Sequence, residues 1–103
     1  MKIITDLPSR EGWHLRDGFP IQVGMKWGAT PFSGAHLHRT MVEYFYLLAG
    51  EICLRVDEKA ITVRQGDLVV VEPGETHEVL CATPDARLLL LMPPPVENDK
   101  VEV

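Results

Sequence analysis

The chain is dominated by short stretches in which apolar and polar residues alternate, and helical periodicity is hard to find. In the clearest example, small and polar residues alternate with four apolar side chains, Ile21, Val23, Met25 and Trp27. A period of two is typical of a strand that buries one face. By this criterion, and from short apolar runs bounded by turn residues, we expect strands over residues 21–27, 43–49, 52–56, 61–64, 68–71, 77–81 and 87–92.

Turn residues separate these strands at intervals of about 8 to 12 residues. Gly50, Gly66 and Gly74, each with polar neighbours, mark three of the turns. Such spacing predicts an all-β fold, an antiparallel sandwich or barrel. Three prolines from Pro93 onward end the last strand, because proline cannot donate to a sheet. Residues 93–103 therefore form a tail, either a flexible end or a strap.

Two of the expected strands are apolar on both parities, over residues 44–48 and 88–91. Such strands need cover on both faces. A second subunit would provide it, and so would the N-terminal segment folded over the outer face within one chain. We expect a homodimer.

Composition narrows the class of protein. The 103 residues, 46% of them apolar, suit one domain over residues 1–103 with an ordinary core. Ten basic against 15 acidic residues give a net charge of −5, which disfavours nucleic acid and anionic membrane as partners. Two cysteines, Cys53 and Cys81, are too few for a disulfide framework, and no apolar run approaches the ~20 residues of a membrane span. No signal peptide is expected in residues 1–13, which carry charges and a proline, so we expect a cytoplasmic protein.

The candidate functional residues lie in the middle of the chain. His36 and His38 are two positions apart, so in a strand both imidazoles project from the same face. Alone, such a pair is also typical of a solvated face. Glu43 begins an apolar strand and shares the parity of Phe45 and Leu47, the expected interior. A carboxylate there needs a partner because an unpaired buried charge is costly, although a surface position at the strand start is an equally simple interpretation.

His77 opens a later strand, directly after the turn at Pro73 and Gly74. Together with His36, His38 and Glu43 it makes three imidazoles and one carboxylate. This ligand set suits a transition metal with open coordination positions, whereas structural zinc sites are usually rich in cysteine. We expect one divalent transition metal ion per chain, and Fe, Mn, Ni, Co, Cu and Zn all stay open.

The same residues resemble the cupin superfamily of small antiparallel β-barrels. Its first motif, His-x-His followed by Glu and then Gly, is matched within residues 30–50 by His36, His38, Glu43 and Gly50. Its second motif is matched within residues 66–81 by Gly66, Gly74 and His77. The resemblance implies a jelly-roll barrel, or double-stranded β-helix, with a metal held by His36, His38, Glu43 and His77. With all four present, it argues against the metal-free sugar epimerases and the three-His thiol dioxygenases of the superfamily.

Three positions depart from the motifs. Thr30 replaces the glycine that opens the first motif, Glu72 replaces a proline, and Cys81 replaces the final asparagine. None of these removes a ligand.

Strand parity predicts an apolar, partly aromatic pocket around this site. The expected walls are Val23, Met25, Trp27, Phe45, Leu47, Val79 and Cys81. Such a lining favours a small, flat or hydrophobic molecule over a sugar, although Met25 and Trp27 could equally be plain barrel core. Cys81 has no visible activating neighbour, so we expect an apolar filler rather than a nucleophile.

Two functions of different class follow. The first is a metal-dependent enzyme, an oxygenase or an isomerase or cyclase, acting on a small oxygenated organic molecule that chelates the ion. Glu43 is the candidate catalytic base if it leaves the metal during turnover. The alternative is a non-catalytic metal-binding or ligand-binding module, a sensor or storage protein, because no second acid or base is convincing.

Overall fold

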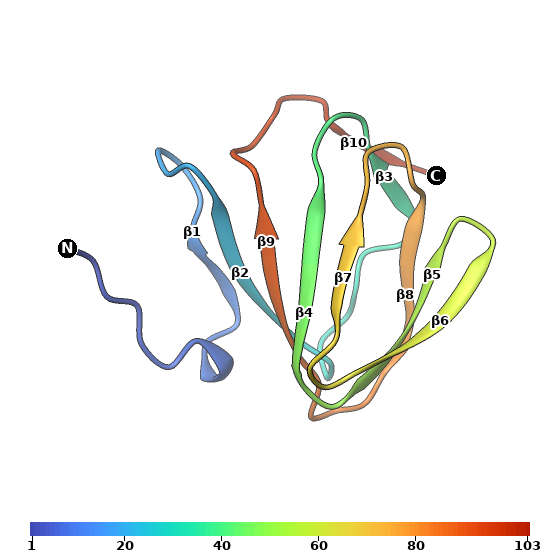
Figure 1. Cartoon of the computed structure of the whole chain (residues 1–103), viewed down its shortest axis with the longest axis horizontal. Helices are drawn as coiled ribbons and strands as arrows, with labels where there is room; N and C mark the ends of the chain where they lie inside the picture. Colours follow the sequence, from blue (N-terminus) through green and yellow to red (C-terminus); the bar gives the residue numbers. More distant parts are fainter.

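The structure, a computed structural model of residues 1–103, is built almost entirely from β-strands (Figure 1). Its elements in chain order are η1 (Leu7–Ser9, a 3-10 turn), β1 (Gly12–Leu15), β2 (Gln22–Trp27), β3 (His36–His38), β4 (Glu43–Ala49), β5 (Glu51–Val56), β6 (Lys59–Arg64), β7 (Leu68–Val71), β8 (His77–Ala82), β9 (Arg87–Met92) and β10 (Lys100–Glu102). No helix is long and apolar enough to cross a bilayer.

The strands form two five-stranded antiparallel sheets that face each other. Sheet A has the order β1-β2-β9-β4-β7, and sheet B has the order β10-β3-β8-β5-β6. All pairings within both sheets are antiparallel. The antiparallel barrel expected from the sequence is therefore confirmed.

All seven strands expected from alternation are present, as β2 and β4 to β9. The structure adds β1 and β10, which lie in segments without clear alternation, and the short strand β3, which carries His36 and His38. It also decides the nature of the tail, because β10 pairs with β3 and makes residues 93–103 a strap across the end of sheet B.

Gly50 shows why the β4–β5 turn requires glycine. Its φ of +76° lies in the left-handed region that favours glycine. A Cβ at this position would also lie 2.6 Å from Ala86 Cα, so the backbone of the β8–β9 loop leaves no room for a side chain. The turn is thus fixed by conformation and by close packing together.

The main core lies between the sheets, on the side of the barrel away from the β3 end. It comprises Phe45, Leu47, Ile52, Leu54, Val63, Val71, Ala86 and Leu88, all nearly inaccessible to solvent. The inward residues of β4 and β5 supply half of this cluster, which follows from their alternation.

The phase of β2 differs from our prediction. Val23 pairs with Leu91 and Met25 pairs with Leu89, so these residues share one face of sheet A. The cavity between the sheets is lined instead by residues of the other parity, Gln22 and Lys26. Val23, Met25 and Trp27 therefore face outward. Alternation defines two faces of a strand but does not say which one meets the core.

The N-terminal segment covers this part of the outer face. The Trp27 indole Nε1 donates to the Pro8 carbonyl at 3.1 Å, and the Trp27 backbone N–H donates to Glu11 Oε2 at 2.9 Å. Met25 is consequently buried although it lies on the outer face. The cover does not reach β7, where Leu68 and Val70 remain 57% and 47% exposed.

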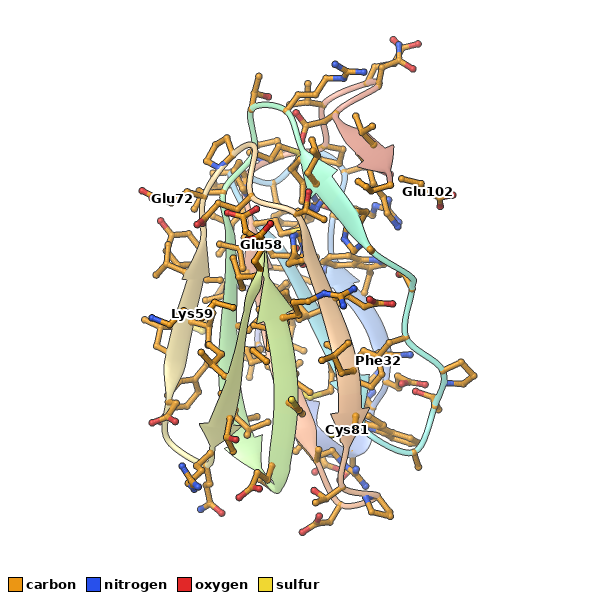
Figure 2. The ribbon with its side chains drawn as sticks, turned by 90° about the vertical axis from the view of Figure 1, so that its right-hand side faces the viewer. Phe32, Glu58, Lys59, Glu72, Cys81 and Glu102 are labelled. Carbon is orange, nitrogen blue, oxygen red and sulfur yellow. The ribbon has the colours of Figure 1, made fainter.

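The position of Cys81 is also corrected. Cys53 pairs with Cys81, but the next residue of β5, Leu54, pairs with Val79, so Leu80 is an extra residue in β8. This β-bulge reverses the alternation after Val79. Cys81 therefore lies exposed on the outside of sheet B, as Figure 2 shows, beside the free thiol of Cys53.

Candidate metal centre

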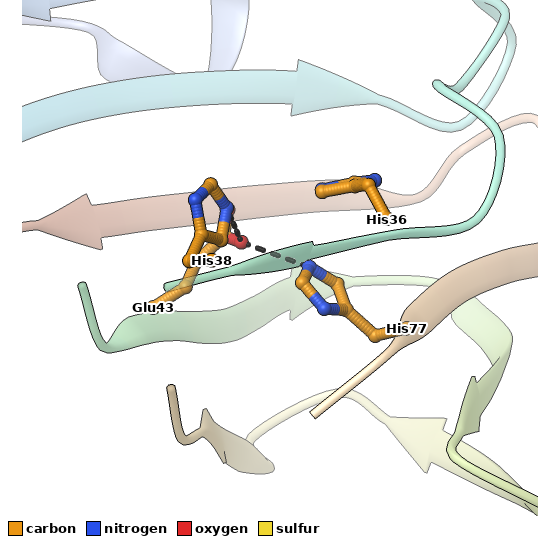
Figure 3. A group of neighbouring side chains, drawn as sticks. All are labelled: His36, His38, Glu43 and His77. Atoms are coloured by element: carbon orange, nitrogen blue, oxygen red, sulfur yellow. Dashed lines mark hydrogen bonds and ion pairs between the residues drawn. The ribbon is translucent and has the colours of Figure 1, made fainter. Parts of the chain in front are cut away.

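Three strands bring the four candidate ligands together between the sheets. His36 and His38 lie on β3, Glu43 begins β4 and His77 begins β8 (Figure 3). One ligand atom from each of the four lies within 4.8 Å of the others. His36 and His77 lie opposite each other in the pairing of β3 with β8, which brings their imidazoles together. The structure thus gathers all four residues singled out in the sequence, which were separated by as many as 41 positions.

Glu43 is the centre of the group. Its Oε1 lies 3.1 Å from His77 Nε2 and 3.3 Å from His38 Nε2. Glu43, His38 and His77 are buried, and His36 is half-buried toward the opening. The two imidazoles are the partners that a carboxylate in this position requires.

The opposite nitrogen of each imidazole faces another acceptor. His36 Nδ1 lies 2.8 Å from the Gly34 carbonyl oxygen, and His77 Nδ1 lies 3.1 Å from the Glu75 carbonyl oxygen. A carbonyl can only accept, so both Nδ1 atoms carry a proton and donate. The Nε2 atoms of His36 and His77 are then the nitrogens available for a metal.

The acceptors around His38 and His77 require an additional positive charge in this group. His77 has a hydrogen-bonded acceptor beside each nitrogen, Glu75 O and Glu43 Oε1, and His38 has a carboxylate oxygen 3.3 Å from each nitrogen, from Asp99 and from Glu43. A neutral imidazole carries one proton and can satisfy only one acceptor. Either a second proton or a cation must therefore lie between the imidazoles and Glu43. The four residues fit a divalent metal ion on this ground as well as by donor type.

The titration of the group reflects the same electrostatics. Burial raises the pKa of Glu43, but the hydrogen bonds and charges of His38 and His77 outweigh it and hold this pKa at about 2. Burial lowers the pKa of His77, but its bonds to Glu43 and the Glu75 carbonyl leave it above the usual value. The pKa of His36 is lowered, mainly by burial, so this imidazole is neutral at pH 7.

A cavity of about 440 Å³ opens beside the ligands. Its apolar wall comes from the inward parity of β9 and from the loop after β2, with Phe45 of β4; the main members are Phe32, Phe45, Leu88, Leu90 and Met92. Phe32 lies in the loop between β2 and β3 (Figure 2). Polar side chains make up the rest of the lining: beside the four candidate ligands these are Arg16, Gln22, Lys26, Ser33, Glu78, Asp99 and Lys100. The cavity suits a small molecule with an apolar body.

The predicted pocket walls divide into three groups. Phe45 and Val79 line the cavity. Leu47 points inward but is 1% exposed in the core below it. The remaining four predicted walls, Val23, Met25, Trp27 and Cys81, lie on the outer faces, for the reasons of strand phase and bulge given above.

The sequence analysis missed several residues of the site. Leu88, Leu90 and Met92 carry an alternating signal in β9, but apolar residues on both parities concealed the inward face. Asp99, beside His38, had no such signal because it lies in a polar tail.

The sequence from residue 25 to residue 92 matches the Cupin domain family, which covers more than half of the chain. The protein belongs to the cupin family. No protein of curated function matches this cupin.

Solved structures show the same fold. A protein from Planctomyces limnophilus superposes with a TM-score of 0.75 at 15% identity, covering 97% of this chain and 96% of that one. Streptomyces PAC13 with uridine gives 0.72 at 15% identity, over 100% and 92% of the two chains. The DMSP lyase DddQ from Ruegeria pomeroyi gives 0.66 at 20% identity, over 82% of this cupin and 43% of that chain. At these identities the similarity concerns the fold.

Proposed function

We propose that this cupin is a mononuclear metal-dependent enzyme that acts on a small oxygenated organic molecule. The observation that carries the proposal is the convergence of three imidazoles and one carboxylate, with acceptors on both sides of two imidazoles, beside an open cavity. A divalent transition metal bound there supplies Lewis-acid or redox chemistry. The identity of the ion is chosen by geometry and availability rather than by these ligands.

The site has two parts, the ligand group and the cavity beside it. His38, Glu43 and His77 are buried and would hold a metal ion together with His36, which is half-buried. The apolar wall formed by Phe32, Phe45 and the inward residues of β9 would receive the body of the substrate, and the polar residues of the same cavity would contact its polar groups. A metal ion held there would supply a binding position for oxygen atoms of the substrate.

Glu43 is better suited to binding the ion than to removing a proton. A carboxylate with a pKa of about 2 is a weak base at neutral pH. Its position between His38 Nε2 and His77 Nε2, at 3.3 and 3.1 Å, favours Glu43 as a ligand over the role of catalytic base.

The chemistry named for two structural neighbours bears on the reaction type. Pac13 is described as a nucleoside dehydratase and DddQ as a DMSP lyase. Both names denote eliminations without net oxidation, so they support a redox-neutral reaction over the oxygenase option. Their low identity to this cupin carries neither substrate over.

Metal content tests the site. Protein purified without a metal-chelating tag should contain about one equivalent of a transition metal, and the double variant His36→Ala/His38→Ala should contain almost none, because it removes two donors. Cys81→Ser is the matched control: it lies on the outer face and should keep the metal. Equal metal content in wild type and double variant would refute the proposal.

Turnover separates the enzyme from the alternative. Candidate diketones, enediols and flavonols should be converted by the metal-loaded protein, with oxygen consumption for an oxygenase and without it for an isomerase or cyclase. The non-catalytic module is supported by the engagement of acids and bases that line the cavity: Glu78 pairs with Arg55, Lys26 with Glu11, and Asp99 accepts from Thr40. It predicts tight metal, no turnover and a bound ligand recovered on denaturation.

We further propose that this cupin forms a homodimer and acts in the cytoplasm. The exposed apolar residues of the outer face of sheet A support the dimer, and the two free thiols support a reducing compartment.

A further inference from the structure

The C-terminal strap reaches the metal centre from outside both motifs. β10 pairs with β3 so that Lys100 lies opposite His38 and Glu102 lies opposite His36. The residue just before β10, Asp99, extends this pairing, because its carbonyl accepts from the Arg39 backbone N–H at 2.8 Å. The strap thus runs directly alongside the strand that carries two of the candidate ligands.

The Asp99 carboxylate is buried and fully engaged. It is only 3% exposed. Oδ1 accepts from the backbone N–H of Thr40 at 2.7 Å and from its hydroxyl at 2.6 Å, while Oδ2 accepts from the Met41 N–H at 3.3 Å. These bonds hold the carboxylate in place, and Oδ2 lies 3.3 Å from His38 Nδ1.

His38 differs from the other two imidazoles in the origin of this contact. His36 and His77 each face the backbone carbonyl two residues earlier in their own segment. His38 has no such local partner: its buried Nδ1 makes no hydrogen bond of good geometry, and the Asp99 carboxylate is the charged group beside it. The orientation of His38 therefore depends on a residue 61 positions away.

We propose that Asp99 is a positioning residue of the metal centre, which keeps the proton of His38 on Nδ1 and directs Nε2 toward the ion. A carboxylate behind a ligating imidazole fixes its tautomer and ring orientation and makes it a stronger donor. The strap of residues 93–103 then contributes a residue to the metal centre. The inference rests on the proposed metal binding.

A purely structural role makes a different prediction. If Asp99 only ties the strap to the loop at Thr40 and Met41, any loss of those bonds should affect the centre equally. Two variants separate the roles. Asp99→Asn keeps an oxygen for Thr40 but removes the charge and places an N–H₂ group at one side of the carboxamide. Thr40→Val removes the hydroxyl bond to Asp99 and leaves the carboxylate beside His38.

Zinc affinity is the first measurement, by competition with a chromophoric chelator. Asp99→Asn should bind Zn²⁺ about 10-fold to 100-fold more weakly than wild type, the range for loss of such a partner. Thr40→Val should stay within about threefold, and Asp99→Glu should recover part of the loss because it restores a carboxylate. Equal affinity in Asp99→Asn and wild type, or equal losses in Asp99→Asn and Thr40→Val, would overturn the proposal.

Imidazole NMR gives a readout that needs neither a variant nor a bound metal. In ¹⁵N-labelled wild-type protein treated with a chelator, Nδ1 of His38 should carry a proton, as it also should after zinc loading. An unprotonated Nδ1 would overturn the role of Asp99. If wild type binds no zinc while Nδ1 is protonated, the proposed metal function fails and the contact between Asp99 and His38 stands.

Discussion

At the scale of single residues, Glu43 is a buried charge that is stabilised by imidazole partners. Glu43 is 7% exposed and begins a strand of the main core. It stays ionised because His38 and His77 present nitrogens at 3.3 and 3.1 Å. Both imidazoles are in turn backed by oxygen acceptors, so the charge pattern extends outward from the centre.

This pattern predicts an acid-dependent loss of stability in protein stripped of metal. The folded-state pKa of Glu43, about 2, lies below its ordinary value of 4.5, so its contribution is present above pH 4.5 and is lost as the pH falls toward 2. At 1.36 kcal/mol per pKa unit, this pKa difference corresponds to a contribution of about 3 kcal/mol to the free energy of unfolding. Urea unfolding followed between pH 5 and pH 2 should show a shallower pH dependence for Glu43→Gln than for wild type.

The control for this experiment is Glu58→Gln, which changes an exposed carboxylate in the β5–β6 turn. Its pH dependence should match that of wild type. His77 acts in the opposite sense: its raised pKa gives stability at acid pH that is lost as the pH rises through the folded-state value. A wild-type slope in Glu43→Gln would contradict the assigned role of the carboxylate.

Among the elements, one turn combines two independent demands on a glycine. Gly50 has a φ of +76°, and a Cβ there would meet Ala86 Cα at 2.6 Å and Thr83 Oγ1 at 2.5 Å. Gly66 has a φ of +93°, with nothing within 4 Å of the same position. The two turns therefore share a conformation and differ in packing.

Substitution of these glycines separates conformation from packing. Gly66→Ala should cost about 1 kcal/mol, the penalty of a left-handed alanine, whereas Gly50→Ala should cost about 2 to 4 kcal/mol because backbone must also move. Chemical denaturation of the two variants measures the difference. Equal losses would show that the β8–β9 loop yields readily, against the close approach seen in the structure.

Element-level prediction succeeded where the pattern was local and failed where phase mattered. Alternation located β5 with its inward face, and in β4 the parity of Glu43 with Phe45 and Leu47 identified the inward face of an otherwise apolar strand. It assigned β2 to the wrong face, since the N-terminal segment buries Val23 and Met25 from outside. It also missed the bulge at Leu80 that turns Cys81 outward, because a single inserted residue leaves no compositional signal.

At the scale of the whole molecule, the outer face of sheet A stays exposed over β7, at Leu68 and Val70. Two cross-strand rows run over it, one through Tyr44 with Val70 and Leu91, the other through Tyr46 with Leu68 and Leu89. No charged residue interrupts these rows. An uncharged patch of this kind can pair with its own copy about a two-fold axis.

The homodimer predicts a response to charge on this face. Wild type should sediment at twice the chain mass of 11.6 kDa, and the double variant Leu68→Glu/Val70→Glu should sediment as a monomer, because pairing would bury four like charges. Leu80→Glu is the control, since Leu80 is 46% exposed but lies on sheet B. A wild-type monomer at micromolar concentration, or equal dissociation in the control, would rule out this interface.

The sequence by itself determined the class of fold, the turns and the four candidate ligands. These follow from local signals: period-two alternation, glycines with polar neighbours, and the spacing of His36, His38, Glu43 and His77. The tertiary structure decided which face of β2 points inward, where Cys81 lies and that Asp99 stands behind His38. Each of these depends on contacts between segments far apart in the chain, and such contacts leave no periodic trace in the residues that make them.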